Sequence, residues 1–144
     1  MLPNEIESLK IYTDGGARGN PGEAACAFVV IKDGKILYKS GFYLGKKTNN
    51  EAEYFGVIKS LEWLLKKRFY KIKAVFFLDS ELITKQLSGA FKVKSRNLKS
   101  LFRIVKFLEK RLDAKLSFNS IPREKNKIAD RIVNIVLNQK IKRN

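Results

Sequence analysis

The stretch IYTDGGARGNPGEAACAFVV, residues 11–30, decides the architecture expected for this chain. An apolar run delivers one carboxylate, Asp14, into a segment that holds four glycines and a proline, and the chain then becomes apolar again. This alternation is typical of two strands joined by a constrained turn. We expect a strand over residues 8–14 that ends on the carboxylate, a glycine-rich turn, and a second strand over residues 24–32.

Length and composition predict one globular domain that spans residues 1–144. Hydrophobic residues make up 44 % of the chain and charged residues 31 %, as in an ordinary folded domain. No apolar run approaches the roughly 20 residues that span a bilayer, and the N-terminal MLPNEIESLK lacks the apolar centre of a secretion signal. The single cysteine, Cys26, lies in an apolar stretch and favours a buried thiol in a reducing compartment, so we expect a cytoplasmic protein.

The charge balance favours a polyanionic partner. Thirty Lys and Arg oppose fourteen Asp and Glu, a net charge of +16, which suits nucleic acid better than a membrane because no basic amphipathic anchor is present. Adaptation to a hot habitat or biased genome composition is the alternative reading of the lysine excess. The chain has no histidine, which excludes histidine as a metal ligand, general base or proton shuttle.

The hydrophobic pattern along the chain predicts an α/β fold. The turn signal KDGK introduces a third strand that pairs with the second, and Ser80 is placed to cap a short helix. The apolar run AVFFL predicts a strand buried on both faces. The expected order is βββαβααβα, a mixed five-stranded sheet of three antiparallel strands and then parallel additions, flanked by helices. Beyond residue 34 the expected strands are 35–44, 74–78 and 116–121, and the expected helices are 50–68, 80–87, 98–112 and 126–141.

Four acids fall at the ends of strands or the beginnings of helices: Asp14, Glu53, Asp79 and Asp130. Asp14 and Asp79 end two strands that a parallel arrangement would place side by side, and we expect Glu53 and Asp130 in the first turns of two helices at the same rim. Each acid also has a structural alternative, because aspartate forms turns and acidic residues favour helix N-termini. The convergence of all four at one rim favours a shared site.

Clustered carboxylates without histidine or cysteine favour a hard cation with oxygen ligands, Mg²⁺ or Mn²⁺. Two such ions, roughly 3.5–4 Å apart, would activate a water and stabilise the leaving oxygen of a phosphodiester. Without cations the four carboxylates would repel one another.

The motifs around these acids resemble those of type 1 ribonuclease H. The resemblance lies in YTDGGARGNPG (residues 12–22), TNNEAEY (48–54), LDSELITKQLSG (78–89) and IPREKNKIADRIVN (121–134), in the family's order and spacing over nearly the whole chain. It implies that Asp14, Glu53, Asp79 and Asp130 are catalytic metal ligands, and that Glu51 is a solvated helix residue.

The resemblance implies an endonuclease that cleaves the RNA strand of RNA–DNA hybrids, leaving 5′-phosphate and 3′-hydroxyl ends. Nothing in the sequence demands more than a monomer. Activity on double-stranded RNA stays open, as does a catalytically silent nucleic-acid-binding module on the same fold. Gly16, Ala17, Asn20, Asn49 and Asn50 would line the hybrid, and Thr48 and Asn20 would form a pocket for a DNA phosphate. Helix capping is the alternative role of Asn49 and Asn50, and the two roles can coexist.

The chain departs from the family at one position of the active site. Many members carry a histidine in the loop before the last helix, and alignment places Ser120 there. Because the metals supply most of the catalysis, we do not infer inactivity. Assistance from Arg123 or Glu124 is a hypothesis.

Overall fold

The structure, a computed structural model, describes residues 6–143. Its strands are β1 (Ser8–Gly19), β2 (Gly22–Lys32), β3 (Lys35–Lys47), β4 (Lys73–Leu78) and β5 (Lys115–Ser120). Its helices are α1 (Asn49–Lys66), α2 (Glu81–Leu87), α3 (Arg96–Leu112) and α4 (Lys127–Arg143), with an unpredicted 3₁₀ turn, η1 (Arg123–Lys125), before α4. The predicted order of strands and α-helices is confirmed, and most predicted boundaries lie within three residues.

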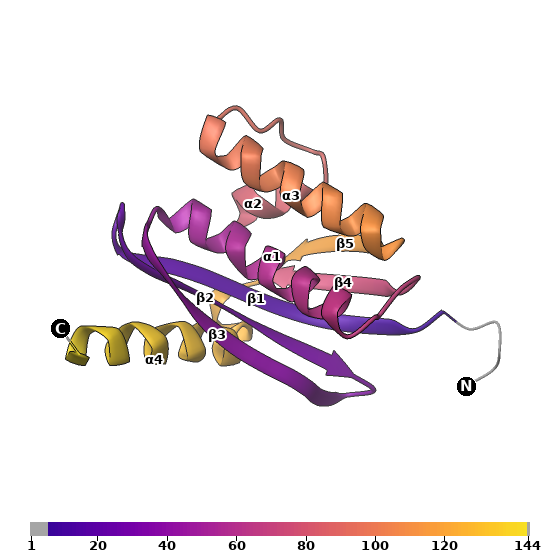
Figure 1. Cartoon of the computed structure of the whole chain (residues 1–144), viewed down its shortest axis with the longest axis horizontal. Helices are drawn as coiled ribbons and strands as arrows, with labels where there is room; N and C mark the ends of the chain where they lie inside the picture. The colour runs from indigo at the N-terminus through magenta and orange to yellow at the C-terminus, as the bar shows by residue number, and fades with distance from the viewer. Residues whose placement is uncertain (1–5, 144) are drawn as a thin grey trace.

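The five strands form one sheet in the order β3-β2-β1-β4-β5. β1, β2 and β3 are antiparallel neighbours, whereas β4 is parallel to β1 and β5 is parallel to β4. The predicted mixed sheet is therefore confirmed. α1 packs on β1 and β2 with α3 outside it, and α4 covers the opposite face of the sheet (Figure 1).

The two faces of the sheet are covered unequally. A large apolar cluster fills the space between the sheet and α1, α2 and α3, while a smaller one joins β2 to α4 through Ala25, Ala27, Val29, Ala129, Val133 and Leu137. On β4, Ala74, Phe76 and Leu78 are buried but Val75 and Phe77 are only half-buried. The prediction that this strand is buried on both faces is wrong, because α4 packs on β1, β2 and β3 and leaves that side of β4 partly open.

The glycine-rich segment after Asp14 is strand rather than turn, which corrects the expected boundary. β1 continues to Gly19 and pairs residue by residue with β2, from Asp14 opposite Ala27 to Gly19 opposite Gly22. Only Asn20 and Pro21 remain for the turn. The reason for glycine is the close approach of α1: a Cβ on Gly15 would lie 2.2 Å from the carbonyl carbon and oxygen of Ala52. The glycine therefore lets a helix backbone lie directly against the strand that carries Asp14.

None of the helices among residues 6–143 is long and apolar enough to cross a bilayer. The expectation that the N-terminus is not a secretion signal concerns residues 1–10. Residues 1–5 of that segment lie outside the described residues. Cys26 is buried, as predicted, and its burial raises the pKa of the thiol to about 12.

Candidate functional site

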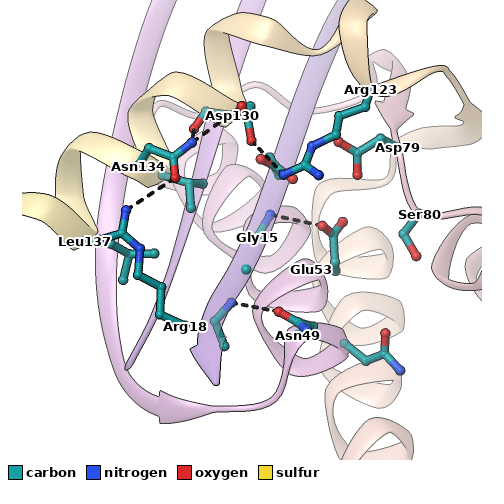
Figure 2. Close-up of a pocket in the computed structure, with 15 residues that line it drawn as sticks. Gly15, Arg18, Asn49, Glu53, Asp79, Ser80, Arg123, Asp130, Asn134 and Leu137 are labelled. Carbon is teal, nitrogen blue, oxygen red and sulfur yellow. Dashed lines mark hydrogen bonds and ion pairs between the residues drawn. The ribbon is translucent and has the colours of Figure 1, made fainter. Parts of the chain in front are cut away.

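Three of the predicted acids converge at one edge of the sheet. β1 and β4 run parallel with Tyr12 beside Phe77, so Asp14 and Asp79, each two residues further on, emerge side by side. Glu53 reaches the same place from α1, in its second turn rather than the predicted first. One carboxylate oxygen from each acid lies within 4.8 Å of the others (Figure 2).

Asp130 lines the same pocket but stands apart from that group of three. The four acids share a cavity of about 480 Å³, and Asp130 enters it from the first turn of α4. Its Oδ1 atom lies 3.5 Å from Nη2 of Arg123, and its Oδ2 atom accepts a hydrogen bond from Asn134 at 3.5 Å. The structure thus places the fourth acid at the predicted rim, with its carboxylate held by residues of η1 and α4.

Glu53 has the clearest character of a cation ligand. The residue is buried, its Oε1 accepts a hydrogen bond from the Gly15 N–H at 3.2 Å, and its Oε2 is buried without a partner. An unpaired buried carboxylate oxygen is costly unless a cation or donor meets it. Three convergent carboxylates with one such oxygen, and no histidine or cysteine among them, fit a divalent cation bound by oxygen.

Burial and mutual repulsion raise the pKa values of these acids. Burial and then the charge of Asp79 raise the pKa of Asp14 to about 7, and burial and then Asp14 raise the pKa of Glu53 well above its usual 4.5. Burial also raises the pKa of Asp79, although Asn126 and Arg123 lower it in part. The ionised carboxylates repel one another, so a bound cation would stabilise their charged form.

This repulsion predicts a pH-dependent stability of the metal-free protein. A carboxyl whose pKa is raised on folding stabilises the fold below its unfolded pKa, and that contribution is lost as the pH rises through the folded value. In EDTA we therefore expect the Tm to fall between pH 5 and pH 8. Asp14→Asn should remove part of the fall and raise stability at pH 8, by at most about 4 kcal/mol, because folding raises the pKa of Asp14 from 3.8 to about 7.

Thermal unfolding followed by circular dichroism, in EDTA and in Mg²⁺, measures this effect. Asp113→Asn changes an exposed acid after α3, where the backbone is left-handed and asparagine is well tolerated, and it serves as the control. A Tm in EDTA that is the same at both pH values, with no gain from Asp14→Asn, would contradict the prediction.

Four of the six predicted substrate-binding residues line the cavity: Gly16, Ala17, Asn49 and Asn50. Thr48 and Asn20 lie beside the cavity without lining it. The three segments are tied together, because Asn49 Oδ1 accepts a hydrogen bond from the Ala17 N–H at 2.8 Å and Asn20 Oδ1 accepts one from the Asn49 N–H at 2.9 Å. These bonds bring the three segments together, and the role of their residues in substrate binding stays a prediction.

The beginning of α1 corrects one alternative and one prediction. The N-cap is Thr48, whose hydroxyl accepts a hydrogen bond from the Glu51 N–H, so Asn49 and Asn50 are the first two helical residues rather than caps. Glu51 returns the bond by accepting from the Thr48 N–H at 2.9 Å. Glu51 is thus half of a capping box and not merely a solvated residue.

Among the residues of the site that sequence reasoning missed are Arg18, Asn126 and Asn134. Arg18 and Asn134 line the cavity, and Nη2 of Arg18 lies 3.5 Å from Oδ1 of Asn134 (Figure 2). Asn126 is buried and donates a 2.8 Å hydrogen bond to the carbonyl of Thr13, which fixes the beginning of α4 against β1. All three lie within or beside the quoted motifs, but nothing in the motifs showed that α4 and β1 would meet.

Ser120 stands where many family members carry the histidine. Ser120 ends β5 and does not line the cavity. Arg123 does line it and contacts Asp130, as the hypothesis of assistance requires. Glu124 instead lines a separate small cavity with Tyr12 and Val29, and its assistance at this site stays a hypothesis.

Comparisons with known proteins match the chain to one family model and to named relatives. The family model described as reverse transcriptase-like matches residues 12–136. The ribonuclease HI of Halobacterium salinarum is 36% identical over 138 residues, covering 95% of this chain and 68% of the relative. The bifunctional protein Rv2228c of Mycobacterium tuberculosis is 36% identical over 126 residues, covering 86% of this chain. The chain spans only about a third of the length of that mycobacterial relative, 34%.

Solved structures give the same picture. The crystal structure of LC11-RNase H1 in complex with an RNA/DNA hybrid matches with a TM-score of 0.89 and 39% identity, covering 92% of this chain and 99% of the other. The structure of ribonuclease H1 from Halobacterium salinarum matches with a TM-score of 0.85 and 34% identity, covering 92% and 98%.

Proposed function

This chain belongs to the type 1 ribonuclease H family, and from that membership we propose that it hydrolyses the RNA strand of RNA–DNA hybrids as a metal-dependent endonuclease. The products carry 5′-phosphate and 3′-hydroxyl ends, and residues 1–144 act as one catalytic domain. The observation that carries the proposal is the group of three carboxylates whose oxygens lie within 4.8 Å of one another, one Glu53 oxygen being buried without a hydrogen-bond partner. The same cavity is lined by the segment of β1 after Asp14 and by the amides of Asn49 and Asn50.

Asp14, Glu53, Asp79 and Asp130 are the proposed ligands for Mg²⁺ or Mn²⁺, two ions being held when the substrate is bound. When bound, these ions would supply an activated water and stabilise the leaving oxygen. The chain's own residues hold the carboxylates in place: the Gly15 N–H orients Glu53, and Asn126 anchors α4 and with it Asp130. Attack is in line and forms no covalent intermediate with the protein.

The strand segment and the beginning of α1 form the proposed substrate surface. Small side chains at Gly16 and Ala17 leave room for the substrate. Backbone groups there and the side-chain amides of Asn49 and Asn50 can hydrogen bond to ribose 2′-hydroxyls. Asn20 and Thr48 lie at the edge of this surface, where we assign them to a phosphate of the DNA strand. The 2′-hydroxyl is the group that distinguishes RNA from DNA.

The test uses end-labelled RNA–DNA hybrid, double-stranded RNA and double-stranded DNA of one sequence. We expect cleavage of the RNA strand of the hybrid in Mg²⁺ or Mn²⁺ and none in EDTA. The double-stranded RNA substrate tests the second activity that the family resemblance leaves open. Binding of the hybrid without cleavage in either metal would instead identify a silent binding module. The proposed state in solution is a monomer, which light scattering coupled to gel filtration measures.

A further inference from the structure

We propose that Arg18 binds a phosphate of the RNA strand beside the one that is cleaved, and that Asn134 positions its guanidinium for this contact. The inference rests on the proposed function, because it assigns a further substrate contact to the same cavity. It comes from an asymmetry between the two walls of that cavity.

The wall formed by α1 carries no cation. Asn49 and Asn50 line it, and the amide of Asn49 is bonded to the Ala17 N–H. Arg18 lies on the other wall, formed by α4, beside Asn134 and Leu137 (Figure 2). A nucleic-acid strand lying over the acids would therefore meet neutral hydrogen-bonding groups on one side and a guanidinium on the other.

Two cations line the cavity, and only one of them contacts a carboxylate. Arg123 lies 3.5 Å from Asp130, whereas no ion pair among residues 6–143 includes Arg18. The contact of Arg18 with Asn134 uses one of the five N–H donors of its guanidinium. An exposed guanidinium with unused donors at the rim of the cavity is suited to a phosphate, which it can bind through two parallel hydrogen bonds.

Asn134 has both of its amide atoms engaged. Its Nδ2 donates to the carbonyl oxygen of Asp130 at 3.1 Å and lies 3.5 Å from Oδ2 of the same residue, one helical turn earlier. The amide oxygen is thereby left facing Arg18. Because the donor side of the amide faces Asp130, its acceptor side faces the Arg18 guanidinium and holds it at the cavity. The side chain of Arg18 then loses less conformational entropy when a phosphate binds.

Binding is measured by fluorescence anisotropy in an Asp79→Asn background, with a hybrid whose RNA strand has a short run of ribonucleotides to limit the binding registers. Arg18→Ala is expected to weaken binding about tenfold and to lower the dependence of log K on log salt by about one. Arg18→Lys keeps the charge but not the paired donors of the guanidinium, so its affinity should lie between those of the parent and Arg18→Ala. Asn134→Ala should weaken binding about threefold. Arg131→Ala is the control, since it removes an equal charge from α4 at a separate cavity lined by Lys39.

Neutral methylphosphonates, placed singly along the RNA strand, locate the contact. At one position next to the cleaved phosphate, the substitution should weaken binding by the parent but add little to the loss in Arg18→Ala. In the active enzyme, Arg18→Ala should raise KM and leave kcat and the Mg²⁺ concentration for half-maximal rate unchanged.

The outcomes separate this inference from the proposed function. If the parent enzyme cleaves hybrids and Arg18→Ala behaves like Arg131→Ala in affinity and salt dependence, the inference fails and the function stands. A loss confined to kcat would also overturn it. If no cleavage occurs in Mg²⁺ or Mn²⁺, the proposed function fails, while the anisotropy series still decides whether Arg18 binds the RNA strand.

Discussion

Replacing Asp79 by asparagine is expected to lower the rate of hybrid cleavage by at least about 10³-fold, a loss of about 4 kcal/mol of transition-state stabilisation. Asparagine matches aspartate in shape but lacks the charge. Asp79 supplies one of the three carboxylate oxygens that lie within 4.8 Å of one another, so the substitution removes one of the three carboxylates at the proposed cation site. Burial already raises the pKa of Asp79, so the neutral side chain should not destabilise the metal-free fold.

Single-turnover cleavage of a labelled hybrid measures the loss, and calorimetric titration with Mg²⁺ shows whether it follows weaker metal binding. Asp33→Asn, in the turn between β2 and β3, is the matched control, because its left-handed backbone suits asparagine as well as aspartate. Cleavage within tenfold of the parent enzyme would remove Asp79 from the proposed machinery.

Gly15→Ala is expected to reduce the free energy of unfolding by about 3 kcal/mol or more. The added Cβ would lie 2.2 Å from the carbonyl carbon and oxygen of Ala52 and 2.5 Å from the nitrogen of Glu53. These are backbone atoms of a helix, so no side chain can turn aside to make room, and α1 must move away from β1. The same movement would withdraw Glu53 from Asp14 and from the Gly15 N–H, so activity should fall together with stability.

The adjacent glycine provides the control for this experiment. A Cβ on Gly16 would meet nothing within 4 Å, so Gly16→Ala should change stability by less than about 1 kcal/mol. Urea unfolding of both variants gives the comparison. Equal stability of Gly15→Ala and the parent protein would mean that α1 does not pack as closely on β1 as described.

Much of the fold follows from local signals in the sequence. Hydrophobic periodicity placed the helices, the Asp-Gly turn placed the hairpin of β2 and β3, and parallel pairing of two strands placed Asp14 beside Asp79. The far end of β1 was missed because glycine disfavours strands, and here the reason for glycine is the approach of α1, which no local pattern reveals. The capping box of Thr48 and Glu51 was present in the sequence as Thr-x-x-Glu and could have been found.

The contacts of α4 could not be predicted in the same way. Periodicity gave the helix, but the meeting of Asn134 with Arg18, and of Asn126 with Thr13, depends on how α4 lies across the sheet. The individual roles assigned to the four acids and to the six substrate-binding residues stay predictions until the variants are measured.

The unequal cores on the two faces of the sheet have a consequence for local opening of the site. Asp14, Glu53 and Asp79 belong to elements packed on the larger cluster, whereas Asp130 belongs to α4, whose contact with β2 is made by the smaller cluster rich in alanine and valine. Local opening costs less where less apolar area is buried, so we expect α4 to open more readily than the elements that carry the three-acid group. On this expectation the wall formed by β1 and α1 stays in place throughout the native state, whereas the wall formed by α4 exchanges between ordered and open forms without global unfolding.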